Sequence, residues 1–249
     1  MGELMTMLVL ASLAGLAIPA GALLARVPLL GPQWLQTEFR HSVIAFGGGA
    51  LLAAVALVLV PEGSKGLSIP LTVATMLGGG VFFCILDALL ARTKGAVSQL
   101  VAMLADFVPE ALALGAMFAA GASGAVLLAL LIALQNLPEG FNAYREMTGV
   151  DQPRHEHRRR SAQGLPGARV LVLFALLVPL GPLAGVVGHL WLADVPAVLA
   201  GIMLFAAGGI LYLVFQDIAP QARLDKHWVP TLGAVLGFLL GLVGHMLVH

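Results

Sequence analysis

Long apolar stretches, separated by short polar segments, run through nearly the whole chain. Eight of them are about as long as a membrane is thick: residues 4–26, 40–61, 68–91, 97–120, 123–145, 168–192, 195–218 and 229–248. A helix of roughly 20 apolar residues crosses the hydrocarbon core of a bilayer, and it satisfies its backbone hydrogen bonds internally. The pattern therefore predicts an all-α, polytopic membrane protein in which residues 1–249 form one transmembrane domain of eight helices.

Composition supports this class and excludes others. Hydrophobic residues make up 59% of the chain and charged residues only 10%, which is far from the composition of a soluble domain. The formal net charge is zero, so there is no electrostatic case for binding nucleic acid. The single cysteine, Cys84, excludes an internal disulfide and a paired-cysteine metal or redox motif. The lipid bilayer is the first partner that we expect.

Basic residues predict the orientation of the helices. Twelve of the thirteen Lys and Arg residues lie in or beside the loops that follow predicted helices 1, 3, 5 and 7, and only Lys65 lies elsewhere. Cytoplasmic loops carry such an excess, so we place these loops in the cytoplasm and both termini outside it. The longest of them, residues 146–167, is polar and basic. The expected location is the cell membrane, which in a bacterium is the inner, cytoplasmic membrane.

Predicted helices 2 and 7 share a pattern at a constant offset of 159 residues. Phe46 and the three glycines after it correspond to Phe205 and the small residues after it, and Pro61 corresponds to Pro220. The two helices run in opposite directions in the predicted topology. An inverted-topology repeat of this kind is common among transporters. Small residues on these helices indicate close helix packing, and a sliding contact is a second interpretation.

Two acidic helix turns contain the candidate chemistry. Asp106 and Glu110 lie four residues apart in predicted helix 4, and Gln135 and Glu139 lie four residues apart in helix 5, so each pair shares one helix face. Asn136 is adjacent and offers another oxygen. Carboxylates within a membrane span are costly and usually have a partner or a function. Together these side chains form an oxygen-rich set of ligands for a divalent cation.

A proline lies inside each of these turns. Pro109 removes a backbone hydrogen bond and leaves the carbonyl of Ala105 free, and Pro138 does the same for Leu134. Such breaks are tolerated where neighbouring helices or a wet cavity satisfy the freed groups. A purely structural interpretation, in which the polar residues only join helices by hydrogen bonds, remains as the alternative. Three acids on two proline-containing helices favour the metal site.

These motifs resemble those of the ZIP (Zrt/Irt-like) family of divalent metal transporters. The segment Gln135-Asn136-Leu137-Pro138-Glu139-Gly140 is a close match to the family's fifth-helix motif. The segment Asp106-Phe107-Val108-Pro109-Glu110-Ala111 is a partial match to the fourth-helix motif. The ending Leu59-Val60-Pro61-Glu62 of predicted helix 2 is similar to a further family motif, and the helix count and outward termini also agree.

The resemblance implies a fold and a function. It implies a 3+2+3 arrangement, with helices 1–3 and 6–8 around helices 4 and 5, and transport of a divalent transition metal into the cytoplasm. The cargo would be zinc, manganese or iron, with cadmium and cobalt as further candidates, and no cofactor is expected. The primary site would consist of Asp106, Glu110, Gln135 and Glu139, with Asn136 beside it. A homodimer is an option that the sequence leaves open.

Departures from the family pattern refine these expectations. Many members hold a second metal, but here Phe107 stands where the asparagine ligand would be, and Val178 stands where a helix-6 glutamate would be. We therefore expect one metal rather than two. Asp106 replaces the usual histidine, and an all-oxygen site favours manganese or ferrous iron over zinc.

Two other functions compete with a transporter. The first is a metal-binding sensor or a transport-dead homologue, which would bind the ion without flux. The second is an intramembrane enzyme, which the chain does not favour because it lacks a HExxH motif and a convincing nucleophile.

Overall fold

The computed structural model describes residues 2–27, 33–93, 96–122, 124–149, 164–225 and 227–248. Every regular element among these residues is helical. Eight of the described helical segments are long and apolar enough to cross a membrane. The predicted class, an all-α multi-pass membrane protein, is therefore confirmed.

The first five spans contain six α-helices. The first is α1 (Gly2–Arg26), and the second continues from α2 (Gln33–Ala54) through a π-helical turn (η1, Val55–Leu59) into α3 (Val60–Lys65). The next three are α4 (Ile69–Thr93), α5 (Ala96–Ala119) and α6 (Ala125–Thr148).

The last three spans are less regular. The sixth consists of α8 (Gly167–Leu177), α9 (Leu180–Val187) and a π-helical turn (η2, Gly188–Leu192). The seventh consists of α10 (Pro196–Leu213), a π-helical turn (η3, Val214–Ile218) and α11 (Ala219–Ala222). The eighth begins with a short 3₁₀ turn (η4, Val229–Thr231) and continues as α12 (Leu232–Val248).

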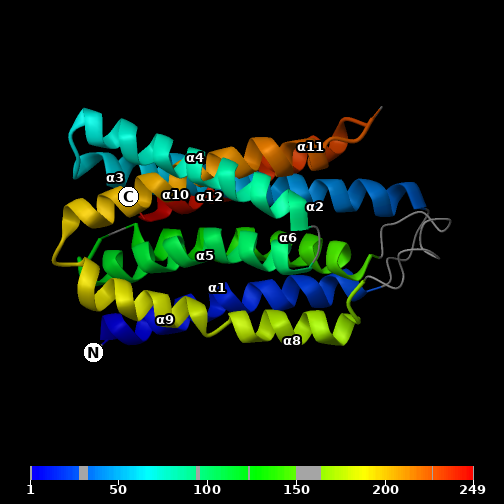
Figure 1. Cartoon of the computed structure of the whole chain (residues 1–249), viewed down its shortest axis with the longest axis horizontal. Helices are drawn as coiled ribbons and strands as arrows, with labels where there is room; N and C mark the ends of the chain where they lie inside the picture. Colours follow the sequence, from blue (N-terminus) through cyan, green and yellow to red (C-terminus); the bar gives the residue numbers. More distant parts are fainter. Residues whose placement is uncertain are drawn as a thin grey trace.

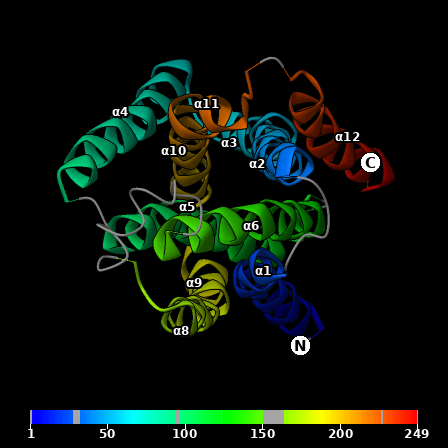
Figure 2. The same cartoon turned by 90° about the vertical axis from the view of Figure 1, so that its right-hand side faces the viewer.

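The helices form two groups, with α5 and α6 in the middle of the molecule (Figures 1 and 2). The first helix group contains α1, α5, α6, α8 and α9, and the second contains α2, α3, α4, α10, α11 and α12. Within the first group, α1 approaches α6 so closely that a side chain on Gly140 would collide with the backbone carbonyl of Ile18. Within the second group, α4 approaches α10 just as closely, because a side chain on Gly79 would collide with the backbone carbonyl of Phe205. Small residues allow this backbone contact.

The 159-residue repeat of the sequence is also present in the backbone, as two π-helical turns at corresponding positions. η1 begins at Val55 and η3 at Val214, again 159 residues apart, and each precedes the helix that contains Pro61 or Pro220. Proline has no N–H to donate, and its ring collides with the carbonyl four residues before it. A π-helical turn is wider than an α-helical one, so it accommodates the missing hydrogen bond and the ring. Figure 1 shows that α2–α3 and α10–α11 run in opposite directions, as the repeat predicts.

The structure differs from the predicted boundaries in four places. The second span, predicted as 40–61, begins at Gln33 and ends at Lys65. The sixth span, predicted as one helix, is interrupted at Pro179, which cannot donate a backbone hydrogen bond, and Val178 N–H bonds to the carbonyl of Ala175 instead. The seventh extends to Ala222 rather than 218. In the predicted loop 146–167, residues 146–148 still belong to α6, which ends at Gly149 with a φ of 70°, a left-handed conformation that suits glycine. Residues 150–163 of that loop lie outside the described residues.

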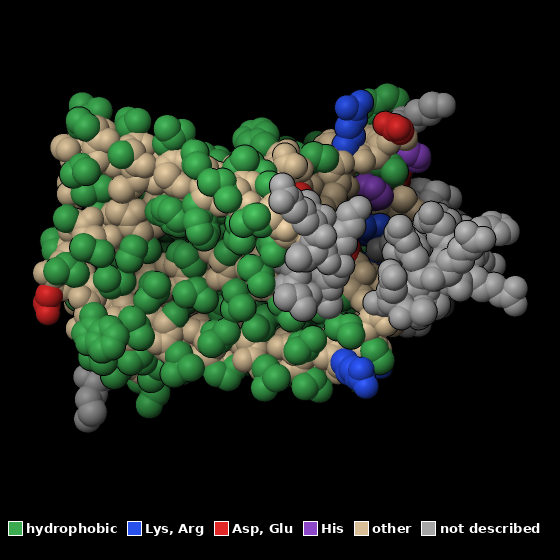
Figure 3. Space-filling model, viewed as in Figure 1, with side chains coloured by type: hydrophobic (Ala, Val, Ile, Leu, Met, Phe, Trp, Pro, Cys, Tyr) green, Lys and Arg blue, Asp and Glu red, His purple; other side chains and the backbone are tan. Residues whose placement is uncertain are grey.

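Apolar side chains cover most of the middle of the face shown in Figure 3. The described Lys and Arg side chains of this face gather at the end where α2 begins and α6 ends. This separation agrees with a chain whose middle faces hydrocarbon and whose ends face water. The largest buried cluster lies where α1, α2, α5, α6 and α10 meet.

Candidate metal centre

The two proline-containing turns lie inside uninterrupted helices. Pro109 lies within α5 and Pro138 within α6, so the predicted four-residue spacing does place each pair of polar side chains on one helix face. Glu110 is fully buried and Gln135 is 1% exposed. Asp106 is also buried, and Glu139 is half-buried. The sequence therefore predicted correctly that this polar set lies inside the protein.

A hydrogen bond joins the two helices at the centre of this set. The Gln135 amide Nε2 donates to Glu110 Oε2 at 2.5 Å, across 25 residues of sequence. A hydrogen bond to a carboxylate is stronger than one between neutral groups, and it holds both side chains in one geometry. Two of the four predicted ligands are thus in direct contact.

Three buried oxygens near this bond have no hydrogen-bond partner within the described part of the chain. They are Oε1 of Glu110, Oε1 of Gln135 and Oδ1 of Asn136. All three are acceptors, and more than nine in ten buried polar groups in native structures are paired. Leaving such a group unpaired costs roughly 1–3 kcal/mol, and more for a charged one. A cation, or a water molecule that donates, would satisfy them.

Asn136 is directed toward a third helix. Its Nδ2 donates to the backbone carbonyl of Ala14 in α1 at 2.9 Å. This anchors α6 to α1 in a region where the two backbones are already close, because Gly21 lies against the carbonyl of Leu137. Asn136 therefore has a structural bond in addition to its unpaired oxygen. No sequence pattern indicates this partner, because any backbone carbonyl can accept.

The other two carboxylates, Asp106 and Glu139, lie close enough to Glu110 to interact with it electrostatically. The charge of Asp106 acts on both Glu110 and Glu139, and that of Glu139 acts on Glu110. Across the described ranges, however, no three His, Cys, Asp or Glu side chains are close enough together to hold a metal ion. Like charges repel across a medium of low dielectric constant, and this favours separated carboxylates. An ion bound by all three carboxylates would require them to lie closer together.

The positions that correspond to a second metal in the resembled family meet around one turn of α1. A methyl group added to Gly15 would lie 3.3 Å from the Cα atom of Val178 and 3.6 Å from Cζ of Phe107. The Phe107 ring is 2% exposed and also lies against Gly181. Phe107 and Val178 offer no side-chain oxygen or nitrogen. These two apolar side chains stand where the second metal would need ligands, which is compatible with the expectation of one metal.

Polar contacts outside the site are located toward the ends of the helices. Tyr212 donates to Asp87 Oδ2 at 3.1 Å, joining α10 to α4. Lys65 pairs with Glu62 at 2.8 Å at the end of α3. Asn142 donates to Gln221 at 3.0 Å and so connects α6 of the first helix group with α11 of the second. This last contact was not predicted, because its two residues are 79 positions apart and lie in helices whose packing no sequence pattern indicates.

Comparison with known proteins does not identify the family. No family model matches the chain, and no curated protein matches it. The resemblance to ZIP transporters rests on the motifs alone and stays a prediction.

Proposed function

We propose that this protein transports a divalent transition-metal ion, such as zinc, manganese or ferrous iron, into the cytoplasm through a single carboxylate-rich site between α5 and α6. The observation that carries the proposal is the pair Glu110 and Gln135, in contact deep inside the protein with one unpaired oxygen each. Asp106 and Glu139 lie on the same faces one helical turn away, and would complete the ligand set.

The burial of the site supports an ion as its occupant. Negative charge at membrane depth is costly, and a divalent cation compensates it most completely. The ligands available are carboxylate and amide oxygens, which suit manganese and ferrous iron better than zinc. Within a ZIP-like 3+2+3 arrangement, the site would lie between the two central helices.

The division into two helix groups supports alternating access. The site residues lie on α5 and α6 of the first helix group, and these helices face α2 and α10 of the second. Movement of one group against the other would expose the site first to one side of the membrane and then to the other. In the predicted orientation, the end with the basic loops is the cytoplasmic side.

Uptake into proteoliposomes tests the proposal. We would compare zinc, manganese, ferrous iron and cadmium, using wild type, Glu110→Gln, Glu139→Gln and Glu3→Gln. The last variant is a matched control, because Glu3 is an exposed carboxylate in the first turn of α1, outside the motifs of the site. Loss of flux in the first two variants with normal flux in the control would support the carboxylate pathway.

Calorimetric binding on the same samples separates the transporter from its main competitor. Binding that depends on Glu110 without flux of any ion would indicate a metal-binding sensor or transport-dead protein. Flux that survives both substitutions would place the pathway elsewhere.

A further inference from the structure

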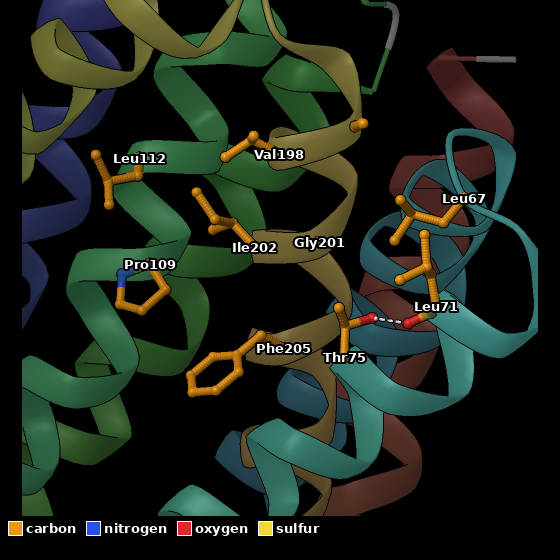
Figure 4. A pocket seen from close by; sticks show the side chains of 10 residues that line it. Leu67, Leu71, Thr75, Pro109, Leu112, Val198, Gly201, Ile202 and Phe205 are labelled. Carbon is orange, nitrogen blue, oxygen red and sulfur yellow. Dashed lines mark hydrogen bonds between the residues drawn. The ribbon is translucent and has the colours of Figure 1, made fainter.

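A groove of about 590 Å³ lies between α4, α5 and α10, apart from the candidate metal centre. Figure 4 shows Pro109 and Leu112 of α5 on one side, facing Ile202 and Phe205 of α10, with side chains of α4 beyond. The groove therefore lies on the boundary between the two helix groups. We propose that it binds an acyl chain of a membrane phospholipid.

The chemistry of the lining favours hydrocarbon over water. Nine of its ten residues are apolar; the exception is Thr75. The Thr75 hydroxyl donates to the carbonyl of Leu71 at 2.7 Å, within its own helix, so it offers the groove little hydrogen-bonding capacity. An internal water needs two to four polar partners, and an apolar space without them stays dry or takes up an apolar molecule.

The opening of the groove faces the lipid phase. At its mouth, Leu71 is 54% exposed and Val198 is 51% exposed, whereas Pro109 and Phe205 at its floor are only partly exposed. Leu71 and Val198 belong to segments that are apolar enough to cross a membrane. In a bilayer the neighbouring molecules at that depth are lipid tails.

Charge at one end of the groove fits a phospholipid. Leu67 lines the groove, and two residues before it Lys65 exposes 70% of its side chain. An ammonium group has three donors, and the bond to Glu62 uses one of them. The others are available to a lipid phosphate while the tail extends along α4 toward Pro109.

The tail would occupy a position next to the site helix. Pro109 immediately precedes Glu110, so a chain in the groove would contact the proline of α5 on the side opposite its buried neighbours. This inference does not depend on the transported species, because it follows from the shape and chemistry of the groove alone.

Quenching of tryptophan fluorescence by brominated acyl chains tests the proposal on the full chain in nanodiscs. Trp34, Trp191 and Trp228 are first replaced by phenylalanine, and one indole is then introduced by Phe205→Trp at the floor of the groove. Leu77→Trp, at a site 65% exposed on α4, is the lipid-facing reference. Phe174→Trp, at a fully buried site, is the reference without lipid. Ile202→Trp replaces Phe205→Trp if that variant does not fold.

We expect brominated lipid to quench the groove indole to at least half the extent of the Leu77→Trp reference, and iodide in the aqueous phase to leave it unquenched. Adding Gly201→Leu should lower that quenching at least twofold and leave the reference unchanged. Gly201 suits this purpose because a Cβ atom there meets only Thr75 Cγ2, at 3.8 Å. Quenching by iodide would overturn the proposal by indicating a water-filled vestibule. Quenching no greater than in the buried reference would overturn it by indicating a groove closed to lipid.

Discussion

Replacing Glu110 with glutamine should separate the stability of the site from its function. The substitution keeps the shape of the side chain and removes its charge. The new amide can still accept the bond from Gln135 Nε2, and its own N–H₂ group can donate to Gln135 Oε1, which is unpaired in the described structure. A single amide pair would thus satisfy an oxygen that wild type leaves unsatisfied, and it would also relieve repulsion by Asp106 and Glu139.

The expected gain follows from the groups involved. Pairing a buried polar group is worth roughly 1–3 kcal/mol. In a chain of this size, 1 kcal/mol changes the melting temperature by about 2–4 °C. We therefore expect Glu110→Gln to melt about 2–12 °C above wild type when chelator removes all divalent metal.

Added metal should reverse this order. An ion at one hundred times its Kd stabilises the protein that binds it by about 2.7 kcal/mol. Wild type should gain this stabilisation with manganese and Glu110→Gln should not, so the two melting temperatures should approach or cross. The assay is thermal unfolding in detergent, followed by circular dichroism, with and without chelator and metal. Glu3→Gln, at an exposed position in the first turn of α1, should behave as wild type in both conditions.

Two results would refute this reasoning. If Glu110→Gln is less stable than wild type in chelator, the carboxylate is a structural group whose charge the fold already satisfies. If metal stabilises the variant as much as wild type, the ion binds elsewhere.

Three further predictions concern the ligands and the helix packing. Asp106→His should shift preference toward zinc in competition uptake with manganese, because zinc favours nitrogen ligands, and an unchanged ratio would argue against Asp106 as a ligand. Elemental analysis of the metal-loaded protein should give one ion per chain, because Phe107 fills the neighbouring space, and two ions would contradict this. Gly140→Ala should lower stability by roughly 1–3 kcal/mol, because its Cβ would collide with the backbone of Ile18. Gly78→Ala, with nothing within 4 Å, is the control that should be neutral or stabilising in the same thermal unfolding assay.

The sequence was informative about features that repeat along the chain. Eight apolar stretches predicted eight spans, because apolar length is required of any helix that crosses a membrane. Helical spacing likewise predicted that Gln135 and Glu139 share a face. Features that depend on one particular neighbour were not predictable. The bond from Asn136 to the carbonyl of Ala14 depends on where another helix lies.

The distances between the three carboxylates also depend on one particular neighbour and could not be predicted from the sequence. Spacing within α5 fixes Asp106 relative to Glu110, but the distance across to Glu139 depends on how α5 packs against α6. That packing balances charge repulsion against the bond from Gln135 to Glu110. A sequence pattern identifies the members of such a set and leaves their geometry open.

Glycine contacts indicate where the molecule is most easily separated. Within each helix group, described glycines lie against the backbone of a neighbouring helix, as Gly140 does against Ile18 and Gly79 against Phe205. Between the groups they meet only side chains: Gly47 lies against the ring of Pro138, and Gly241 lies against Leu131. Backbone-to-backbone contacts cannot shift without separating whole helices, whereas side chains can change rotamer. The boundary between the groups is therefore the more deformable one, and the proposed lipid groove lies along it.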